Sequence, residues 1–178
     1  LGDVYKRQIK YVREQKIPFF GICLGMQMAV IEYARNVLKL PSANSVEMDE
    51  DTPNPVISLM DEQRKVANKG GTMRLGAWEC AVKKNTLLHK IYNSDHIEER
   101  HRHRYEFNDA YYEQFEKHGM IASGVNPETK LVEAVELLSH PWFVGVQYHP
   151  EYRSTVAQPH PLFVNFVNAC NNYAQSKK

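Results

Sequence analysis

Long apolar runs and an excess of charge are both missing from this sequence. No stretch approaches the length of a membrane-spanning helix, and the first residues lack the pattern of a signal peptide, so we expect neither a membrane anchor nor export. The 22 Lys and Arg residues nearly cancel the 21 Asp and Glu residues, which leaves no global basic charge to attract nucleic acid or a membrane surface. Internal repeats and low-complexity segments are absent too, and 178 residues suffice for one globular domain with a core.

Cysteine is scarce, and a nucleotide-binding loop is missing. Cys23, Cys80 and Cys170 are odd in number and far apart, which is not a disulfide framework and predicts a reducing, cytoplasmic location. The glycine-rich segment GGTMRLG, residues 70–76, is too short and wrongly spaced for a phosphate-binding P-loop.

The sequence does contain a regular succession of strand-like and helix-like segments. Residues 17–22 form a short apolar run, typical of a strand buried on both faces. Residues 25–38 place apolar side chains at helical spacing, which predicts an amphipathic helix that ends before Pro41. Further strands are expected within 54–60, 72–82 (bent at Gly76), 99–108, 120–126, 131–137 and 142–149, and further helices at 9–16, 86–92, 111–119 and 161–175. This order predicts an α/β fold with a mostly parallel sheet flanked by helices.

The cysteine of most interest is Cys23, in the segment GICLG between the expected strand and the expected helix. Gly-x-Cys-x-Gly is the cysteine counterpart of the Gly-x-Ser-x-Gly elbow, in which a strained turn displays a nucleophile. Gly21 and Gly25 would let neighbouring chain approach closely. We expect the helix N-terminus to lower the pKa of the thiol, and the Leu24 N–H to point at a developing oxyanion. An isolated cysteine is more often a buried core residue, but this context favours a nucleophile.

A base and its partner follow a later apolar strand, in the segment VGVQYHPEY. His149 and Glu151 are two residues apart, so both side chains can leave the strand end on one side, and Pro150 stiffens the link. Glu151 would hold the imidazole tautomer, while His149 would move a proton between the thiol and a leaving amine. The other histidines lack such a neighbour at a strand end and are taken as structural or surface residues.

Together these residues resemble the class I, triad-type glutamine amidotransferases, in which a cysteine on an elbow works with a His-x-Glu pair near the C-terminus. The segments GGTMRLG and ERHRHRYEFN (99–108) are more specific and resemble the amidotransferase domain of the CTP synthase family, rather than GMP or anthranilate synthases. The resemblance covers about residues 10–166 and implies a flavodoxin-like α/β fold whose first βα units are missing. It implies a non-matching N-terminal end, residues 1–8, and a partial amidotransferase domain, residues 9–178.

The resemblance implies hydrolysis of L-glutamine to glutamate and ammonia. Cys23 would attack the side-chain amide, His149 would protonate the leaving ammonia, and Glu151 would complete a catalytic triad. The residues after the nucleophile would line the glutamine site: Leu24, Gly25, Met26 and Gln27. Glu47 would hold the ammonium group of the substrate and Arg104 its carboxylate, a pairing that suits a free amino acid. Without the resemblance, either residue would pass as a solvated surface charge.

No cofactor is implied for this chain itself. In the resembled family a separate synthase domain binds ATP, Mg²⁺ and UTP, receives the ammonia and forms CTP in pyrimidine nucleotide biosynthesis. GTP is expected as an allosteric activator and a homo-tetramer as the parent assembly, so the partners are L-glutamine and the synthase domain. Because the first βα units and their glycine-rich oxyanion loop are missing, we expect this exact chain to be poorly folded or poorly active alone.

Two other classes of function stay open. Another cysteine hydrolase on the same fold, such as a γ-glutamyl hydrolase or a peptidase, would not need GGTMRLG or RHRHR. A non-catalytic interaction module predicts a disabled triad, whereas Cys23, His149 and Glu151 are all present. His101 and His103 could be metal ligands, but no third ligand cluster lies near them in the sequence, so we expect no metal site.

Overall fold

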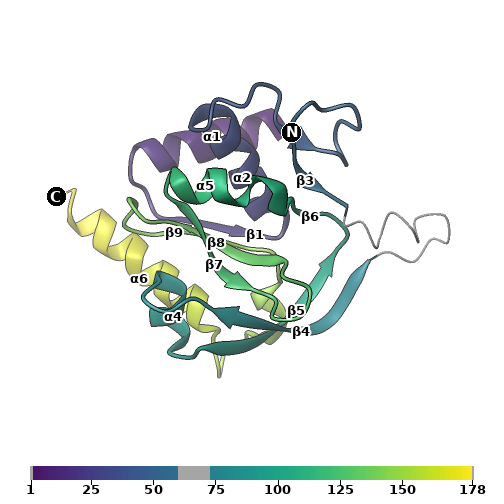
Figure 1. Ribbon diagram of the computed structural model, residues 1–178. Coiled ribbons are helices and arrows are strands. Elements are labelled where there is room, and N and C mark those ends of the chain that lie inside the picture. The colour runs from purple at the N-terminus through teal and green to yellow at the C-terminus, as the bar shows by residue number, and fades with distance from the viewer. Residues whose placement is uncertain (1, 60–72, 178) are drawn as a thin grey trace.

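The computed structural model describes residues 2–59 and 73–177 of the chain. Helices lie on both faces of a six-stranded sheet: α1, α2 and α5 cover one face, and α4 and α6 cover the other (Figure 1). The helices are α1 (Gly2–Glu14), α2 (Leu24–Asn36), α4 (Leu87–Tyr92), α5 (Tyr112–Lys117) and α6 (Pro161–Gln175), with 3-10 turns η2 (Asp109–Tyr111) and η3 (Pro150–Arg153). The strands are β1 (Phe19–Ile22), β2 (Asn44–Ser45), β3 (Pro55–Ser58), β4 (Arg74–Val82), β5 (His96–His103), β6 (Glu106–Phe107), β7 (Met120–Val125), β8 (Val132–Leu137) and β9 (Phe143–Val146).

The strand order of the larger sheet is β1-β9-β8-β7-β4-β5, and a three-stranded sheet has the order β2-β3-β6. In the larger sheet only β1 and β9 run parallel among the described strands, and every other neighbouring pair is antiparallel. The expectation of a mostly parallel sheet is therefore wrong. Parallel neighbours need a long crossover connection, whereas β7, β8 and β9 follow one another through short turns that reverse the chain direction.

Strand β1 is less buried than expected. It lies at one edge of the larger sheet, and Phe19, Phe20 and Ile22 are only partly buried. Beside it an apolar groove of about 790 Å³ runs between α1, β1 and the start of α2, with a lining that includes Ile9, Val12, Phe19, Leu24 and Met28. The expectation of burial on both faces is wrong, because in the described part of the chain no strand lies beyond β1.

Helix α2 is more buried than expected. Residues 26–34 are all buried, so the helix has no solvent-facing stripe and the expectation of an amphipathic helix is wrong. The sheets cover one side of α2, and α1 covers the side that would otherwise face water. Glu32 lies fully buried at this helix–helix contact, where both of its oxygens accept hydrogen bonds from Arg13 at 2.7 and 2.8 Å.

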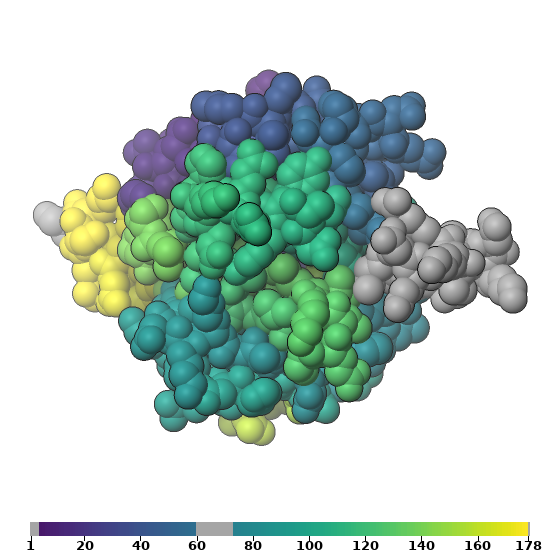
Figure 2. All heavy atoms as spheres, in the orientation of Figure 1, coloured from purple at the N-terminus to yellow at the C-terminus, as the bar shows by residue number. Residues whose placement is uncertain are grey.

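The two faces of the larger sheet hold separate cores, because successive side chains of a strand point to opposite faces. On β9, Phe143 belongs to the core shared with α2 and α5, while its neighbour Val144 belongs to the core shared with α4 and α6. Figure 2 shows one face of the molecule, with the green α5 segment above the teal segments that contain β4, β5 and α4, and the yellow α6 at one side.

The expected strand at 99–108 is divided into β5 and β6, which belong to different sheets because the chain leaves extended pairing at residues 104 and 105. The remaining expected elements are confirmed, within a few residues at their ends, where the structure describes them. Strand β4 carries its bend at Gly76, which has a φ of +88°, and α5 is followed by Gly119 at +97°. Helix α6 begins at Pro161 and ends at Gln175, as the sequence predicts. Residues 60–72, which include the first part of GGTMRLG, lie outside the described residues.

Candidate active site

Cys23 occupies a strained turn between β1 and α2. Its φ is 49° and its ψ is −103°, a region that residues with a side chain rarely adopt. Two hydrogen bonds hold the turn: the Cys23 N–H donates to the Val146 carbonyl at 2.7 Å, and the Gln27 N–H donates to the Cys23 carbonyl at 3.2 Å. The first ties the turn to β9 and the second begins α2. The expected elbow is therefore confirmed.

The two glycines that flank Cys23 in the sequence have different roles. A Cβ on Gly21 would lie 2.7 Å from the carbonyl carbon of Gly25, so only glycine fits there without moving the turn. A Cβ on Gly25 would meet nothing within 4 Å. The expectation of close approach is confirmed for Gly21, because the backbone at the start of α2 lies where its Cβ would be. It is wrong for Gly25, whose Cβ position faces open space.

The thiol of Cys23 is not the pre-formed thiolate that the helix N-terminus suggests. Burial, together with the Glu151 carboxylate, raises its pKa to about 11, although the Leu24 N–H and the Gln147 amide act to lower it. The expected lowering of the pKa is wrong, because desolvation of the partly buried sulfur outweighs the donors near it. Chemistry at this sulfur therefore needs a base that removes the proton.

His149 lies beyond the end of β9, the parallel neighbour of β1. In that pairing Ile22 is opposite Val146, so the residues that follow both strands leave the sheet at the same end. The His149 ring Nδ1 is 2.6 Å from Glu151 Oε1, and the ring stacks on Tyr152 at 5.2 Å. The other nitrogen, Nε2, is buried and has no hydrogen-bond partner among the described residues. The expected His–Glu contact is confirmed, and it leaves Nε2 free to exchange a proton.

The residues that follow Cys23 separate into an exposed pair and a buried pair. The Leu24 residue is 46% exposed and Gly25 is partly exposed, whereas Met26 and Gln27 are buried. Met26 belongs to the α2 core. Gln27 donates from Nε2 to the Tyr105 carbonyl at 3.0 Å and to Gln147 Oε1 at 3.2 Å.

Glu47 and Arg104 are far apart in sequence and lie at the same end of the three-stranded sheet. Glu47 follows β2 and Arg104 precedes β6, with β3 between them parallel to β2 and antiparallel to β6. Both residues are exposed. Arg104 is next to Tyr105, whose carbonyl binds Gln27 of α2, so this end of the small sheet adjoins the elbow helix.

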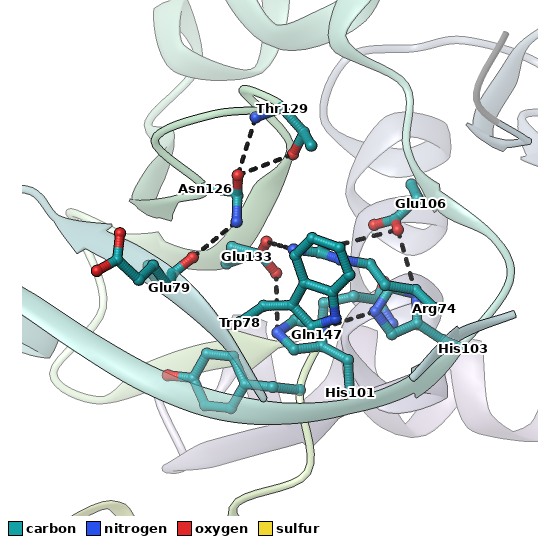
Figure 3. Close-up of polar contacts among 12 residues, drawn as sticks. Arg74, Trp78, Glu79, His101, His103, Glu106, Asn126, Thr129, Glu133 and Gln147 are labelled. Atoms are coloured by element: carbon teal, nitrogen blue, oxygen red, sulfur yellow. Dashed lines mark hydrogen bonds and ion pairs between the residues drawn. The ribbon is translucent and has the colours of Figure 1, made fainter. Parts of the chain in front are cut away.

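A buried charged cluster beside the elbow was not expected from the sequence. Figure 3 shows its side chains converging from β4, β5, β6 and β8. Arg74 Nη2 is 2.6 Å from Glu133 Oε1, and Arg74 Nη1 is 3.8 Å from Glu106 Oε1. His101 Nδ1 is 2.7 Å from His103 Nε2, and each ring also faces one of the two carboxylates at 3.4 Å. The alternation of arginine and histidine in RHRHR could have predicted part of this cluster, because a strand points its histidines inward and its arginines outward.

Burial dominates the titration of this cluster. It raises the pKa of Glu106 to about 8 and of Glu133 to about 7, against the pull of Arg74. Burial, together with the Arg74 cation, lowers the pKa of His101 to about 2 and of His103 to about 3. The histidines are therefore neutral near pH 7, and the single cation Arg74 is balanced by two carboxyl groups that do not both ionise there.

The match to a known family gives the class of this chain. Residues 3–169 match the model of the class I glutamine amidotransferases, and the chain belongs to that family. Its similar curated relatives are CTP synthases. It is 62% identical to the enzyme of Christiangramia forsetii over 170 residues and 65% identical to that of Flavobacterium johnsoniae over 164 residues, covering 96% and 92% of this chain. The same matches cover 31% and 30% of the relatives, so the chain spans about a third of their length.

A solved structure agrees with this placement. The glutaminase domain of Trypanosoma brucei CTP synthase with bound acivicin superposes with a TM-score of 0.90 at 40% identity, over 96% of this chain and 66% of that one. A GMP synthase subunit from Thermoplasma acidophilum, at a TM-score of 0.59 and 16% identity, shares the fold alone. The expected class I amidotransferase fold is confirmed. Among the described helices, none has the length and apolar character that crossing a membrane requires.

Proposed function

We propose that this chain hydrolyses L-glutamine as the glutaminase part of a CTP synthase, with Cys23, His149 and Glu151 as its catalytic triad. The observation that carries the proposal is the strained Cys23 elbow beside a His–Glu pair at the end of the neighbouring parallel strand. The relatives named CTP synthase and the acivicin-bound glutaminase domain support it.

The chemistry follows from the raised pKa of the Cys23 thiol and from the contact between His149 and Glu151. The Cys23 thiol has a raised pKa, so His149 Nε2 removes its proton as the sulfur attacks the amide carbon of glutamine. The Leu24 N–H stabilises the oxyanion. His149 then gives the proton to the leaving ammonia, and water cleaves the γ-glutamyl thioester. Glu151 accepts the Nδ1–H of His149 throughout, which keeps Nε2 available for the proton.

The substrate and partners belong to the same proposal. Glutamine would lie over Leu24 and Gly25, with Met26 and Gln27 beneath, while Glu47 holds its ammonium group and Arg104 its carboxylate. Ammonia would pass to a synthase domain that binds ATP, Mg²⁺ and UTP, in a cytoplasmic homo-tetramer activated by GTP. Among the described residues no group of three or more His, Cys, Asp or Glu side chains could hold a metal ion.

The test is labelling with 6-diazo-5-oxo-L-norleucine, a glutamine analogue that alkylates amidotransferase cysteines, followed by peptide mass spectrometry and an ammonia assay with glutamine. We expect label on Cys23 alone, because Cys80 is buried with a strongly raised pKa and burial also raises the pKa of Cys170 on α6. Cys23→Ser should lose both label and ammonia release, and the matched control Cys170→Ser should keep both.

Three outcomes would contradict the proposal. Label on Cys170 would show simple accessibility rather than an activated site. Hydrolysis of γ-glutamyl peptides without glutamine turnover would indicate another cysteine hydrolase. Absence of label and of turnover, both in this chain and in a CTP synthase chain that contains it, would indicate a non-catalytic module.

A further inference from the structure

Gln147 is a fully buried amide that touches the sulfur of Cys23. It directly follows β9, and its Nε2 donates a hydrogen bond to Cys23 Sγ at 3.5 Å. Its backbone N–H donates to the Glu133 carbonyl at 2.8 Å, so the residue continues the pairing of β9 with β8. These contacts hold the Gln147 side chain between the larger sheet and the Cys23 elbow.

The alternation of the strand explains why the Gln147 side chain faces α2. Val146 and Tyr148 belong to the core under α4 and α6. Gln147 between them therefore points to the opposite face, where α2 begins. There it meets Gln27 in the first turn of α2 and Cys23 at its start.

The neighbours of Gln147 determine which end of its amide faces the sulfur. Gln147 Oε1 accepts from Gln27 Nε2 at 3.2 Å, and that same Nε2 donates to the Tyr105 carbonyl at 3.0 Å. Because a carbonyl only accepts, the donor end of Gln27 is defined, and the carbonyl end of Gln147 must face it. The N–H end of Gln147 is left for Cys23. A buried amide that uses both ends is not a spare core polar group.

We propose that Gln147 is a further catalytic residue of the glutaminase reaction: its Nε2–H hydrogen-bonds Cys23 Sγ and stabilises the sulfur anion when His149 removes the thiol proton, and Gln27 orients it. This inference rests on the proposed role of Cys23 as nucleophile. The Gln147 amide transfers no proton. It donates more strongly to a charged sulfur than to a neutral thiol, which favours ionisation.

The test is the pH dependence of Cys23 alkylation by iodoacetamide, read by peptide mass spectrometry on the intact chain. Iodoacetamide is small and does not require the glutamine site, so the readout reports the sulfur itself. Gln147→Met removes the donor at similar volume. We expect the midpoint of the curve of Cys23 alkylation rate against pH to rise by about one pH unit. The alkylation rate at pH 7.5 should therefore fall about tenfold. Gln27→Met should shift the midpoint in the same direction by less, because it frees the Gln147 amide to rotate.

The controls separate ionisation from folding. Gln175→Leu, an exposed change on α6, should leave the Cys23 midpoint unchanged, and Cys170 provides an internal reference for alkylation in every sample. An unchanged midpoint in folded Gln147→Met, judged by its thermal transition, would overturn the inference. If that variant does not fold, Gln27→Met decides: an unchanged midpoint there would overturn the inference equally.

The two proposals fail in different ways. Glutamine turnover by the unchanged chain, together with a Cys23 midpoint that Gln147→Met does not move, overturns the role of Gln147 alone. Absence of glutamine turnover and of labelling by the glutamine analogue, both in this chain and in a CTP synthase chain that contains it, overturns the proposed function, whatever the alkylation profile shows.

Discussion

At the scale of single residues, the Cys23 turn depends on strain that its surroundings maintain. Cys23 stays at a φ of 49° because its N–H is bonded to β9 and its carbonyl begins α2. Releasing either bond would let the residue relax to an ordinary conformation. The backbone of Gly25 and Met26 packs directly against Gly21, which makes this glycine part of the elbow.

The flanking glycines therefore provide a matched pair of substitutions. In Gly21→Ala the new Cβ would lie 2.7 to 2.9 Å from backbone atoms of Gly25 and Met26, which cannot move without moving Cys23. We expect the free energy of unfolding to fall by about 2 kcal/mol, a usual cost of overpacking, with loss of Cys23 labelling. Gly25→Ala meets open space at the start of a helix and should be neutral or stabilising by up to about 1 kcal/mol.

Urea unfolding of both glycine variants checks this prediction. Equal effects of the two substitutions would show that the backbone of Gly25 and Met26 is not as close to Gly21 as the structure has it.

At the scale of elements, a buried ion pair between Arg13 and Glu32 joins α1 and α2. Arg13 donates from Nε and Nη2 to the two carboxylate oxygens of Glu32. The Glu32 side chain is fully buried, while that of Arg13 is 15% exposed. Asn36 also donates to Glu32 at 3.1 Å. Because Glu32 has no access to water, the pair is asymmetric: removing the arginine leaves a charge in the core.

We expect Arg13→Met to reduce the free energy of unfolding by about 3 kcal/mol, the low end for a broken buried pair, because Asn36 still donates to the carboxylate. Lys10→Met is the control on the same helix. It removes a half-exposed pair with Glu14 at 4.0 Å and should change stability by less than about 0.5 kcal/mol. Urea unfolding at constant pH measures both, and a small loss for Arg13→Met would mean that Glu32 becomes protonated or hydrated.

At the scale of the whole molecule, the buried charged cluster joins the two sheets. Glu106 comes from β6 of the three-stranded sheet, while Arg74, Glu133 and the two histidines come from strands of the larger one. Its protonation is therefore linked to the stability of the whole fold.

The direction of this linkage depends on the pH range. The pKa of Glu106 rises from 4.5 to about 8 on folding, so the folded chain binds the extra proton and loses stability as pH rises through that range. The pKa values of His101 and His103 fall from 6.5 to about 2 and about 3, which has the opposite effect but only below pH 6.5. Above pH 7 the carboxyl contribution dominates.

We therefore expect the free energy of unfolding to fall by about 1 kcal/mol between pH 7 and pH 8.5 in the unchanged chain, from about one proton released on unfolding. Glu106→Gln keeps an uncharged side chain and should flatten this decline. Glu113→Gln, whose side chain is 86% exposed, is the control and should retain it. Urea unfolding at several pH values tests the prediction, and an equal slope in all three proteins would exclude Glu106 as the source.

The sequence by itself determined where most of the elements lie, which residues form the elbow, and that His149 and Glu151 lie close together. Helical spacing, strand alternation and the positions of Gly21, Pro41 and Pro161 act over a few residues, so they are readable without the fold. The same holds for His149 and Glu151, whose contact spans two residues.

Only the tertiary structure decided what depends on distant segments. Strand direction followed from short turns, and α2 lost its exposed face because α1 packs on it. The Cys23 thiol acquired a raised pKa because burial outweighs the local donors that the sequence shows. Arg74 and Gln147 acquired partners 59 and 124 residues away, as the numbering of Glu133 and Cys23 shows. Such partners are set by chain packing, and no local pattern encodes them.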